Sequence, residues 1–133
     1  MAYLIGTALA LAVSLFARLV GLDRDRAFYP TVMIVIAGLY GLFACIGGQP
    51  GELTLEWVMM GGFILTAVLG FKLNLWFVVA ALFGHGVFDY FHPHVIANPG
   101  VPAWWPAFCG TYDVTASAWL AWMLVRGRCP ATP

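Results

Sequence analysis

Residues 84–94 read Gly-His-Gly-Val-Phe-Asp-Tyr-Phe-His-Pro-His and hold all three histidines of the 133-residue chain. His85, Asp89 and His92 are spaced i, i+4 and i+7, so on a helix they lie along one face. The sequence around them is strongly apolar. Ionisable residues inside an apolar helix are energetically costly, and within a membrane they indicate a functional site by default.

The composition is typical of a membrane protein and not of a soluble domain. Hydrophobic residues make up 62% of the chain and charged residues 9%, whereas about a quarter of a soluble domain is charged. The net charge is zero, and no basic or acidic tract indicates a nucleic acid partner. We therefore expect a single transmembrane domain over residues 1–133, surrounded by the lipid bilayer.

Five apolar runs are each long enough to provide the roughly 20 helical residues that cross about 30 Å of hydrocarbon. The predicted fold class is all-α, an integral membrane bundle of five transmembrane helices. The predicted helices span residues 2–22, 28–46, 52–70, 75–91 and 106–125. No positively charged segment precedes the first run, so we expect a retained helix and not a signal peptide. Pro93 is expected to stop the fourth helix.

The positive charges predict the orientation of this bundle. All six Lys and Arg residues lie at the end of the first helix, in the first and third connections, or after the fifth helix. Five helices bring these positions to one side of the membrane, which the positive-inside rule makes cytoplasmic. The predicted orientation is N-terminus out and C-terminus in.

Distance from the basic residues places the polar side chains at a common depth. His85 is as far along the chain from Lys72 as Asp113 is from Arg126, which corresponds to about 20 Å of helix. A second group lies about 25 Å from the same basic residues and consists of Asp89, Glu56 and Cys109. We therefore expect one polar layer in the outer half of the bundle.

This layer has the chemistry of a metal site. The predicted ligands are His85, Asp89, His92 and Asp113. Imidazole and carboxylate ligands suit Zn²⁺ or non-haem iron(II), and the sequence does not choose between these ions. Three further residues are candidates for orienting the ligands: Glu56, His94 and Tyr112. A metal-bound water would permit hydrolysis, although no catalytic residue can be assigned.

The alternative is a structural hydrogen-bond network, in which His85 and Asp113 pair between helices. The chain would then be a non-enzymatic accessory or scaffold protein. Small residues recur every four positions in the first two helices, a spacing that suits close packing against a second copy or a membrane partner. The two seams are Gly6, Ala10 and Ser14, and Ala37, Gly41 and Cys45. A disulfide between Cys45 and Cys109 stays open, because both are expected toward the outer face.

Three stretches resemble an uncharacterised family of small bacterial multi-pass membrane proteins. They are residues 23–30 (Asp-Arg-Asp-Arg-Ala-Phe-Tyr-Pro), residues 85–92 (His-Gly-Val-Phe-Asp-Tyr-Phe-His), and residues 98–109 (Asn-Pro-Gly-Val-Pro-Ala-Trp-Trp-Pro-Ala-Phe-Cys) with Tyr112 and Asp113. The resemblance implies a location in the bacterial inner membrane, and it implies no activity. In that membrane the predicted orientation puts the His/Asp cluster near the periplasmic face.

Overall fold

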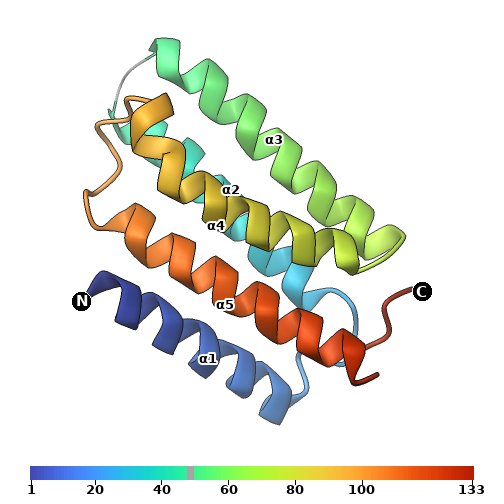
Figure 1. Cartoon of the computed structure of the whole chain (residues 1–133). Helices are drawn as coiled ribbons and strands as arrows, with labels where there is room; N and C mark the ends of the chain where they lie inside the picture. Colours follow the sequence, from blue (N-terminus) through green and yellow to red (C-terminus); the bar gives the residue numbers. More distant parts are fainter. Residues whose placement is uncertain (48–49) are drawn as a thin grey trace.

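The computed structural model describes residues 1–47 and 50–133, without the side chains of residues 50–53. This described part consists of five helices and contains no strand, which confirms the all-α fold class (Figure 1). The helices are Ala2–Val20 (α1), Phe28–Gly47 (α2), Pro50–Lys72 (α3), Trp76–Val95 (α4) and Trp105–Val125 (α5).

The last two helices form the centre of the bundle. Helix α5 packs between α1 and α4, while α3 packs against the other side of α4 (Figure 1). Helix α2 packs against α3 and also contacts α4. Successive helices run in opposite directions from α1 onward. The loop between α4 and α5 therefore lies at the same end of the bundle as the N-terminus (Figure 1). The C-terminus lies at the opposite end.

Helix α1 ends at Val20, two residues before the predicted end. Gly21 follows with a φ of 88°, and its N–H donates to the carbonyl oxygen of Ala17 at 2.9 Å. The N–H of Leu22 donates to the same carbonyl oxygen. Glycine adopts this left-handed conformation without steric cost, so Gly21 is a strong stop signal for the helix.

Helix α4 continues through Pro93 to Val95, beyond the end predicted at residue 91. A proline lacks the N–H that would bond four residues back, so the turn before it loses one hydrogen bond. The next turn still closes, because the N–H of Ile96 donates to the carbonyl oxygen of His92 at 2.9 Å. The loss is therefore confined to one bond near the helix end, and His92 stays on the helix.

The other helix boundaries agree with the predicted ones to within two residues. Helix α3 begins at Pro50 and extends to Lys72. Helix α4 begins at Trp76, whose N–H donates to the side-chain oxygen of Asn74 at 3.0 Å. Helix α5 begins at Trp105, so Pro106 lies in its first turn, where a missing N–H costs no intrahelical bond.

The interior of the bundle is divided along its length into an apolar half and a polar half. The apolar half contains large buried hydrophobic side chains, among them Met33, Leu75, Leu82, Leu120 and Met123. The polar half contains the buried ionisable side chains of α3, α4 and α5: Glu56, His85, Asp89, His92 and Asp113. Apolar packing thus supports one end of the bundle and polar contacts the other.

Among the residues that the structure describes, three helices are long and apolar enough to cross a membrane, namely α1, α2 and the part of α3 from Thr54 to Lys72. Helices α4 and α5 are less apolar, since they contain the histidine stretch and Asp113. Large hydrophobic side chains such as Leu4 (71% exposed) and Leu19 (75% exposed) point away from the bundle. Apolar side chains outside and ionisable ones inside indicate a membrane protein.

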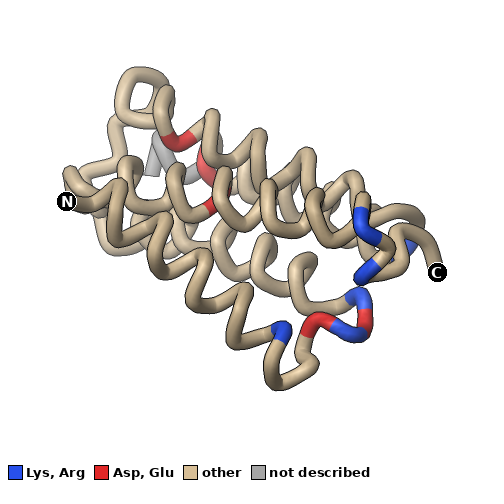
Figure 2. The backbone as a smooth tube through the Cα atoms, turned by 60° about the horizontal axis from the view of Figure 1, so that its bottom comes forward, with Lys and Arg blue, Asp and Glu red and all other residues tan. Residues whose placement is uncertain are grey.

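The basic residues gather at one end of the bundle, whereas the acidic residues of α3, α4 and α5 lie toward the other (Figure 2). At the basic end, Nη2 of Arg26 donates to the carbonyl oxygen of Gly70 near the end of α3, at 3.0 Å. Nη1 of Arg18 lies 3.7 Å from the carboxylate of the buried Asp23. A cation at a helix C-terminus is favourable. Arg26 therefore fixes the loop of residues 21–27 to the end of α3, and the loop covers this end of the bundle.

The small-residue seam of α1 packs within the chain. Gly6, Ala10 and Ser14 are buried, and α1 packs against α5. A Cβ atom added at Gly6 would overlap the carbonyl oxygen of Phe108 and the hydroxyl of Thr111. In α2, Ala37 and Gly41 are buried whereas Cys45 is exposed. Both seams therefore allow close contact between helices of the same chain.

Gly6→Ala tests the contact between α1 and α5. The added methyl group must push the two backbones apart, and overpacking of this kind costs about 1–3 kcal/mol. We expect a lower midpoint of thermal unfolding in detergent. The matched control is Gly38→Ala, because an added Cβ at Gly38 has no atom within 4 Å among the described residues. Equal stability of the two variants would contradict the close packing.

Candidate metal centre

Two pairs of side chains, each spaced i and i+4, face each other across α4 and α5. His85 and Asp89 come from α4, and Cys109 and Asp113 come from α5. One ligand atom from each residue can be chosen so that all four atoms lie within 4.8 Å of one another. All four residues are at most 2% exposed. We call these four residues the His/Asp/Cys cluster.

The centre of the cluster is the carboxylate of Asp113. The Nδ1–H of His85 donates to its Oδ2 at 2.7 Å, and the thiol of Cys109 donates to the same oxygen at 3.8 Å. Oδ2 of Asp89 lies 3.6 Å from Nδ1 of His85, which is too long for a hydrogen bond. His85 is thus bonded to one carboxylate and close to a second.

Three carboxylate oxygens of this cluster lack a hydrogen-bond partner among the described residues. They are both oxygens of Asp89 and Oδ1 of Asp113. Burying an ionised carboxylate without a partner is strongly unfavourable, so such groups are usually protonated, paired or bound to a metal ion. The cluster therefore has unused capacity to bind a proton or a cation.

Two glycines bring the helices of the cluster together. A Cβ atom added at Gly86 would lie 2.9 Å from the carbonyl oxygen of Gly110, and one added at Gly110 would lie 3.2 Å from that of Gly86. Both distances are tighter than ordinary van der Waals contact. Gly86 follows His85 directly, and Gly110 follows Cys109. The close approach of the backbones therefore sets the spacing between the ligand atoms of α4 and α5.

His92 lies in a second group and not with the four residues of the cluster. Its Nε2–H donates to Oε1 of Glu56 on α3 at 2.8 Å, and the side-chain amide of Asn98 donates to the same oxygen at 2.7 Å. Seven residues correspond to about 10 Å along a helix. The ligand atoms of His92 are not among the four that lie within 4.8 Å of one another, and its Nε2 is bonded to Glu56. We call His92, Glu56 and Asn98 the outer triad.

An aromatic layer separates the cluster from the outer triad. The ring of Tyr40 on α2 lies 4.2 Å from the ring of His92 and 5.7 Å from the ring of His85, between centroids. Phe63 on α3 packs edge-on against His85 at 4.8 Å. Phe88 contacts both histidine rings. These rings fix the orientation of the imidazoles and restrict the access of water from this side.

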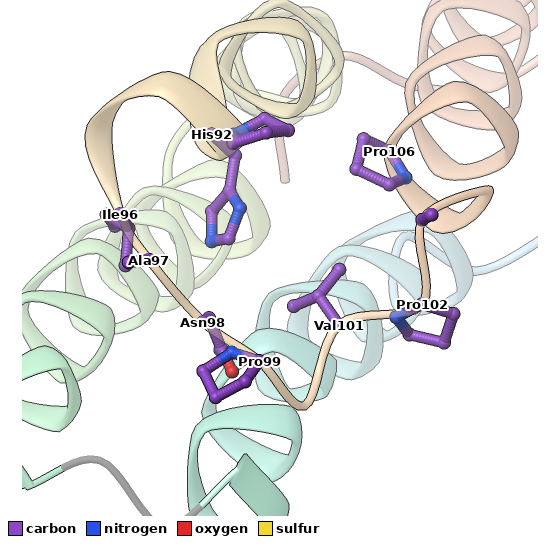
Figure 3. A pocket seen from close by; sticks show the side chains of 10 residues that line it. His92, Ile96, Ala97, Asn98, Pro99, Val101, Pro102 and Pro106 are labelled. Atoms are coloured by element: carbon purple, nitrogen blue, oxygen red, sulfur yellow. The ribbon is translucent and has the colours of Figure 1, made fainter.

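The loop between α4 and α5 borders an open pocket of about 620 Å³ beside the outer triad. Figure 3 shows the ring of His92 pointing into the space between the end of α4, the loop and Pro106. Asn98 and Pro99 line the opposite side of this pocket. The N–H of Gly100 donates to the side-chain oxygen of Asn98 at 3.1 Å, so the loop holds Asn98 toward Glu56.

The remaining predicted residues lie apart from the cluster. His94 is exposed on the last turn of α4. Tyr112 is partly buried and packs against the apolar core. Glu56, one of the candidates for orienting the ligands, belongs to the outer triad. The structure therefore brings together three of the four predicted metal ligands, and places the fourth, His92, with Glu56.

The spacing from Arg126 predicts Cys109 at the depth of the polar layer, but Cys109 is not among the predicted ligands. The available signal was its i, i+4 spacing to Asp113, which matches that of His85 to Asp89. All three cysteines lie in the described part of the chain and carry free thiols. Cys45 is exposed, whereas Cys109 and Cys129 are buried. Burial raises the pKa of the Cys129 thiol in the C-terminal tail.

The cluster could hold a metal ion. Zinc ligands lie about 2.0–2.3 Å from the ion in tetrahedral sites, so neighbouring ligand atoms are roughly 3.3–3.8 Å apart. The cluster atoms are within 4.8 Å of one another, so their largest separation exceeds the upper end of this spacing by at most about 1 Å. The bond between His85 and Asp113 would have to open, since 2.7 Å is shorter than that spacing.

Comparisons of the chain with models of protein families, with curated proteins and with solved structures find no match.

Glu56→Ala tests the outer triad. The substitution removes the acceptor shared by His92 and Asn98, and leaving buried donors unpaired costs about 1–3 kcal/mol. We expect a lower midpoint of thermal unfolding in detergent. His94→Ala, which removes an exposed histidine from the same helix as His92, should leave the midpoint unchanged. A midpoint for Glu56→Ala equal to that of the control would show that the triad contributes nothing to stability.

Proposed function

We propose that the protein is a multi-pass membrane protein that binds one divalent metal ion through His85, Asp89, Cys109 and Asp113. The observation that carries this proposal is the set of four buried ligand atoms within 4.8 Å of one another. Imidazole, thiolate and carboxylate ligands together suit Zn²⁺ best, with iron(II) as the second candidate. This set differs from the sequence prediction by including Cys109 and omitting His92.

The unpaired carboxylate oxygens favour a metal ion over a purely structural network. A network that only stabilises the fold should satisfy its buried polar atoms, yet neither oxygen of Asp89 has a partner within the described part of the chain. A cation would pair with both carboxylates at once. Binding would displace the protons held by the thiol and by Nδ1 of His85, so affinity should fall as the pH is lowered.

We further propose that all five helices cross the inner membrane of a bacterium, with the N-terminus outside. Two features support this proposal: the gathering of the basic residues at one end of the bundle (Figure 2), and the resemblance described above. The less apolar α4 and α5 would be accommodated because their polar side chains face the bundle interior. The cluster would then lie in the half of the membrane nearer the periplasm.

The alternative function is a non-enzymatic accessory or scaffold protein without a bound ion, acting as a homo-oligomer or with a membrane partner. The hydrogen bond of 2.7 Å between His85 and Asp113 favours it, because a buried His–Asp pair can hold two helices together without a metal. The two functions differ in whether loss of these side chains changes metal content or only stability.

Metal content provides the first test. We expect about one zinc or iron atom per chain in wild-type protein purified in detergent, and less than a tenth of that in His85→Ala, Asp113→Asn and Cys109→Ala. His92→Ala and His94→Ala should retain the metal, since neither residue belongs to the cluster. Elemental analysis before and after incubation with zinc at pH 7 measures this, and a second series at pH 5 should show weaker binding.

The contradicting result is well-folded wild-type protein that takes up no zinc or iron during this incubation. Thermal unfolding of each variant serves as the control, because a variant that has lost its fold would also lose its metal. Loss of metal in His92→Ala but not in Cys109→Ala would instead support the ligand set predicted from the sequence.

Thiol labelling of intact cells tests the orientation. In a Cys45→Ser background the two remaining native thiols are buried. We expect Ala97→Cys, in the loop between α4 and α5, to react with a membrane-impermeant maleimide added outside the cells. Thr132→Cys, in the C-terminal tail, should react only after lysis. The reverse pattern would invert the proposed topology.

A further inference from the structure

An open groove of about 290 Å³ runs along the surface of the bundle between α1 and α5. Its walls consist of one residue of α1 and four of α5: Leu11, Thr115, Ala118, Trp119 and Trp122. The four positions of α5 are spaced i, i+3, i+4 and i+7, so they form one face of the helix. The hydroxyl of Thr115 donates to the carbonyl oxygen of Thr111 at 2.7 Å, so it needs no further acceptor. The groove therefore offers an apolar surface to a ligand.

The walls of the groove are accessible from outside the bundle. Leu11 is 44% exposed and Trp122 is 39% exposed. The rings of Trp119 and Trp122 lie 5.3 Å apart between centroids, so they form a continuous aromatic wall. Tryptophan is typical of the interface between a membrane and water. In a bilayer this groove would face the lipids directly.

The backbone after α5 places a guanidinium group over one end of the groove. Gly127 has a φ of 62°, and its N–H donates to the carbonyl oxygen of Leu124 at 3.1 Å. The N–H of Arg128 donates to the carbonyl oxygen of Met123 at 2.9 Å. These two bonds form a Schellman motif, which turns the chain back at a helix end. The guanidinium carbon of Arg128 lies 4.6 Å from the centre of the Trp122 ring, within the range of a cation–π contact.

The residues after Arg128 hold the C-terminal tail against the bundle. Cys129 is buried, with 4% of its surface exposed. The N–H of Leu75 donates to the carbonyl oxygen of Ala131 at 2.8 Å. Arg128 itself is exposed. Its guanidinium group is therefore fixed beside the groove and is accessible to a ligand.

A second guanidinium group lies on the α1 side of the groove. Arg18 is seven residues after Leu11, so it lies on the same face of α1, about 10 Å nearer the basic end. Its side chain is 36% exposed, and its Nη1 lies 3.7 Å from the carboxylate of Asp23. The basic end contains all six basic residues and only two acidic ones, Asp23 and Asp25 (Figure 2). The groove therefore ends in a region of positive charge.

An apolar groove that ends at two guanidinium groups matches the two parts of a charged lipid. We propose that the groove between α1 and α5 binds one anionic phospholipid, with an acyl chain along Ala118 and Trp122 and the phosphate at Arg128 and Arg18. Arginine binds phosphate oxygens through paired N–H groups, and basic residues near a membrane surface attract anionic lipids. The proposal rests on the membrane location and does not involve the metal centre.

Native mass spectrometry of the protein in detergent with added lipid measures this binding. The probes are phosphatidylglycerol, which is anionic, and phosphatidylcholine with the same acyl chains, which is zwitterionic. We expect wild type to bind one phosphatidylglycerol at least about fivefold more tightly, because each basic residue near the headgroup contributes about this factor. Arg128→Gln should lower this preference about fivefold. Ala118→Phe should weaken the binding of phosphatidylglycerol by filling the groove.

Two control variants make the same changes elsewhere on the bundle. Lys72→Gln removes a positive charge from the basic end on α3, and Ala80→Phe adds a ring on α4. Ala80 is as far along the chain from Lys72 as Ala118 is from Arg126, so the two added rings lie at a similar depth. Both controls should bind lipid as wild type does. All four substituted positions are exposed, so we expect the variants to keep the fold.

Four results would overturn the proposal. Equal affinity of wild type for the two lipids would show that the headgroup is not recognised. Equal losses in Arg128→Gln and Lys72→Gln would indicate a diffuse attraction to the basic end. Equal binding by Ala118→Phe and Ala80→Phe would exclude the groove. Displacement of the lipid by excess soluble glycerol phosphate would show that the arginines bind a free phosphate ester without need of an acyl chain.

Discussion

The cost of enclosing ionisable side chains between helices governs the whole structure. Asp89, Asp113 and Glu56 are all buried, and each would be strongly unfavourable there without a counter-charge, a donor or a proton. His85 and His92 provide donors for two of the three. The helices must then be held close enough for these bonds, which explains the glycine contacts between α4 and α5 and the aromatic layer around both imidazoles.

The outer triad and the His/Asp/Cys cluster have different roles. The outer triad satisfies Oε1 of Glu56 with two donors, so it behaves as a structural link between α3, the end of α4 and the following loop. The cluster is less complete, since Asp89 is left unpaired in the part of the chain that the structure describes. Structural polar groups are normally satisfied, and functional ones frequently are not. Oε2 of Glu56 and both oxygens of Asp23 also lack a partner in that part of the chain. The convergence of four ligand atoms within 4.8 Å of one another, together with the unpaired Asp89, therefore distinguishes the site from the scaffold.

Much of the fold follows from the one-dimensional pattern, because apolar runs separated by Gly- and Pro-containing turns specify five helices. A glycine that follows an apolar run predicts the end of a helix, so the sequence also contains the signal that ends α1 at Gly21. The spacing of His85 and Asp89, and the common depth of Asp113, predicted three members of the cluster. The place of His92 could not be obtained from a helical wheel, since its rise of about 10 Å above His85 matters as much as its angle. The contribution of Cys109 depended on which helix faces α4, and helix neighbours are a property of the tertiary structure.

The lower hydropathy of α4 and α5 has a consequence for biosynthesis in the proposed five-span arrangement. Chains are made from the N-terminus, so the three most apolar helices are integrated into the bilayer before this hairpin leaves the ribosome. Glu56 and Tyr40 are then already in the membrane and can receive His92 and His85 as the hairpin enters. The hairpin is the part of the chain least able to insert alone, and its polar side chains are also what the earlier helices recognise. In the proposed arrangement, insertion of this hairpin would therefore also bring His92 to Glu56.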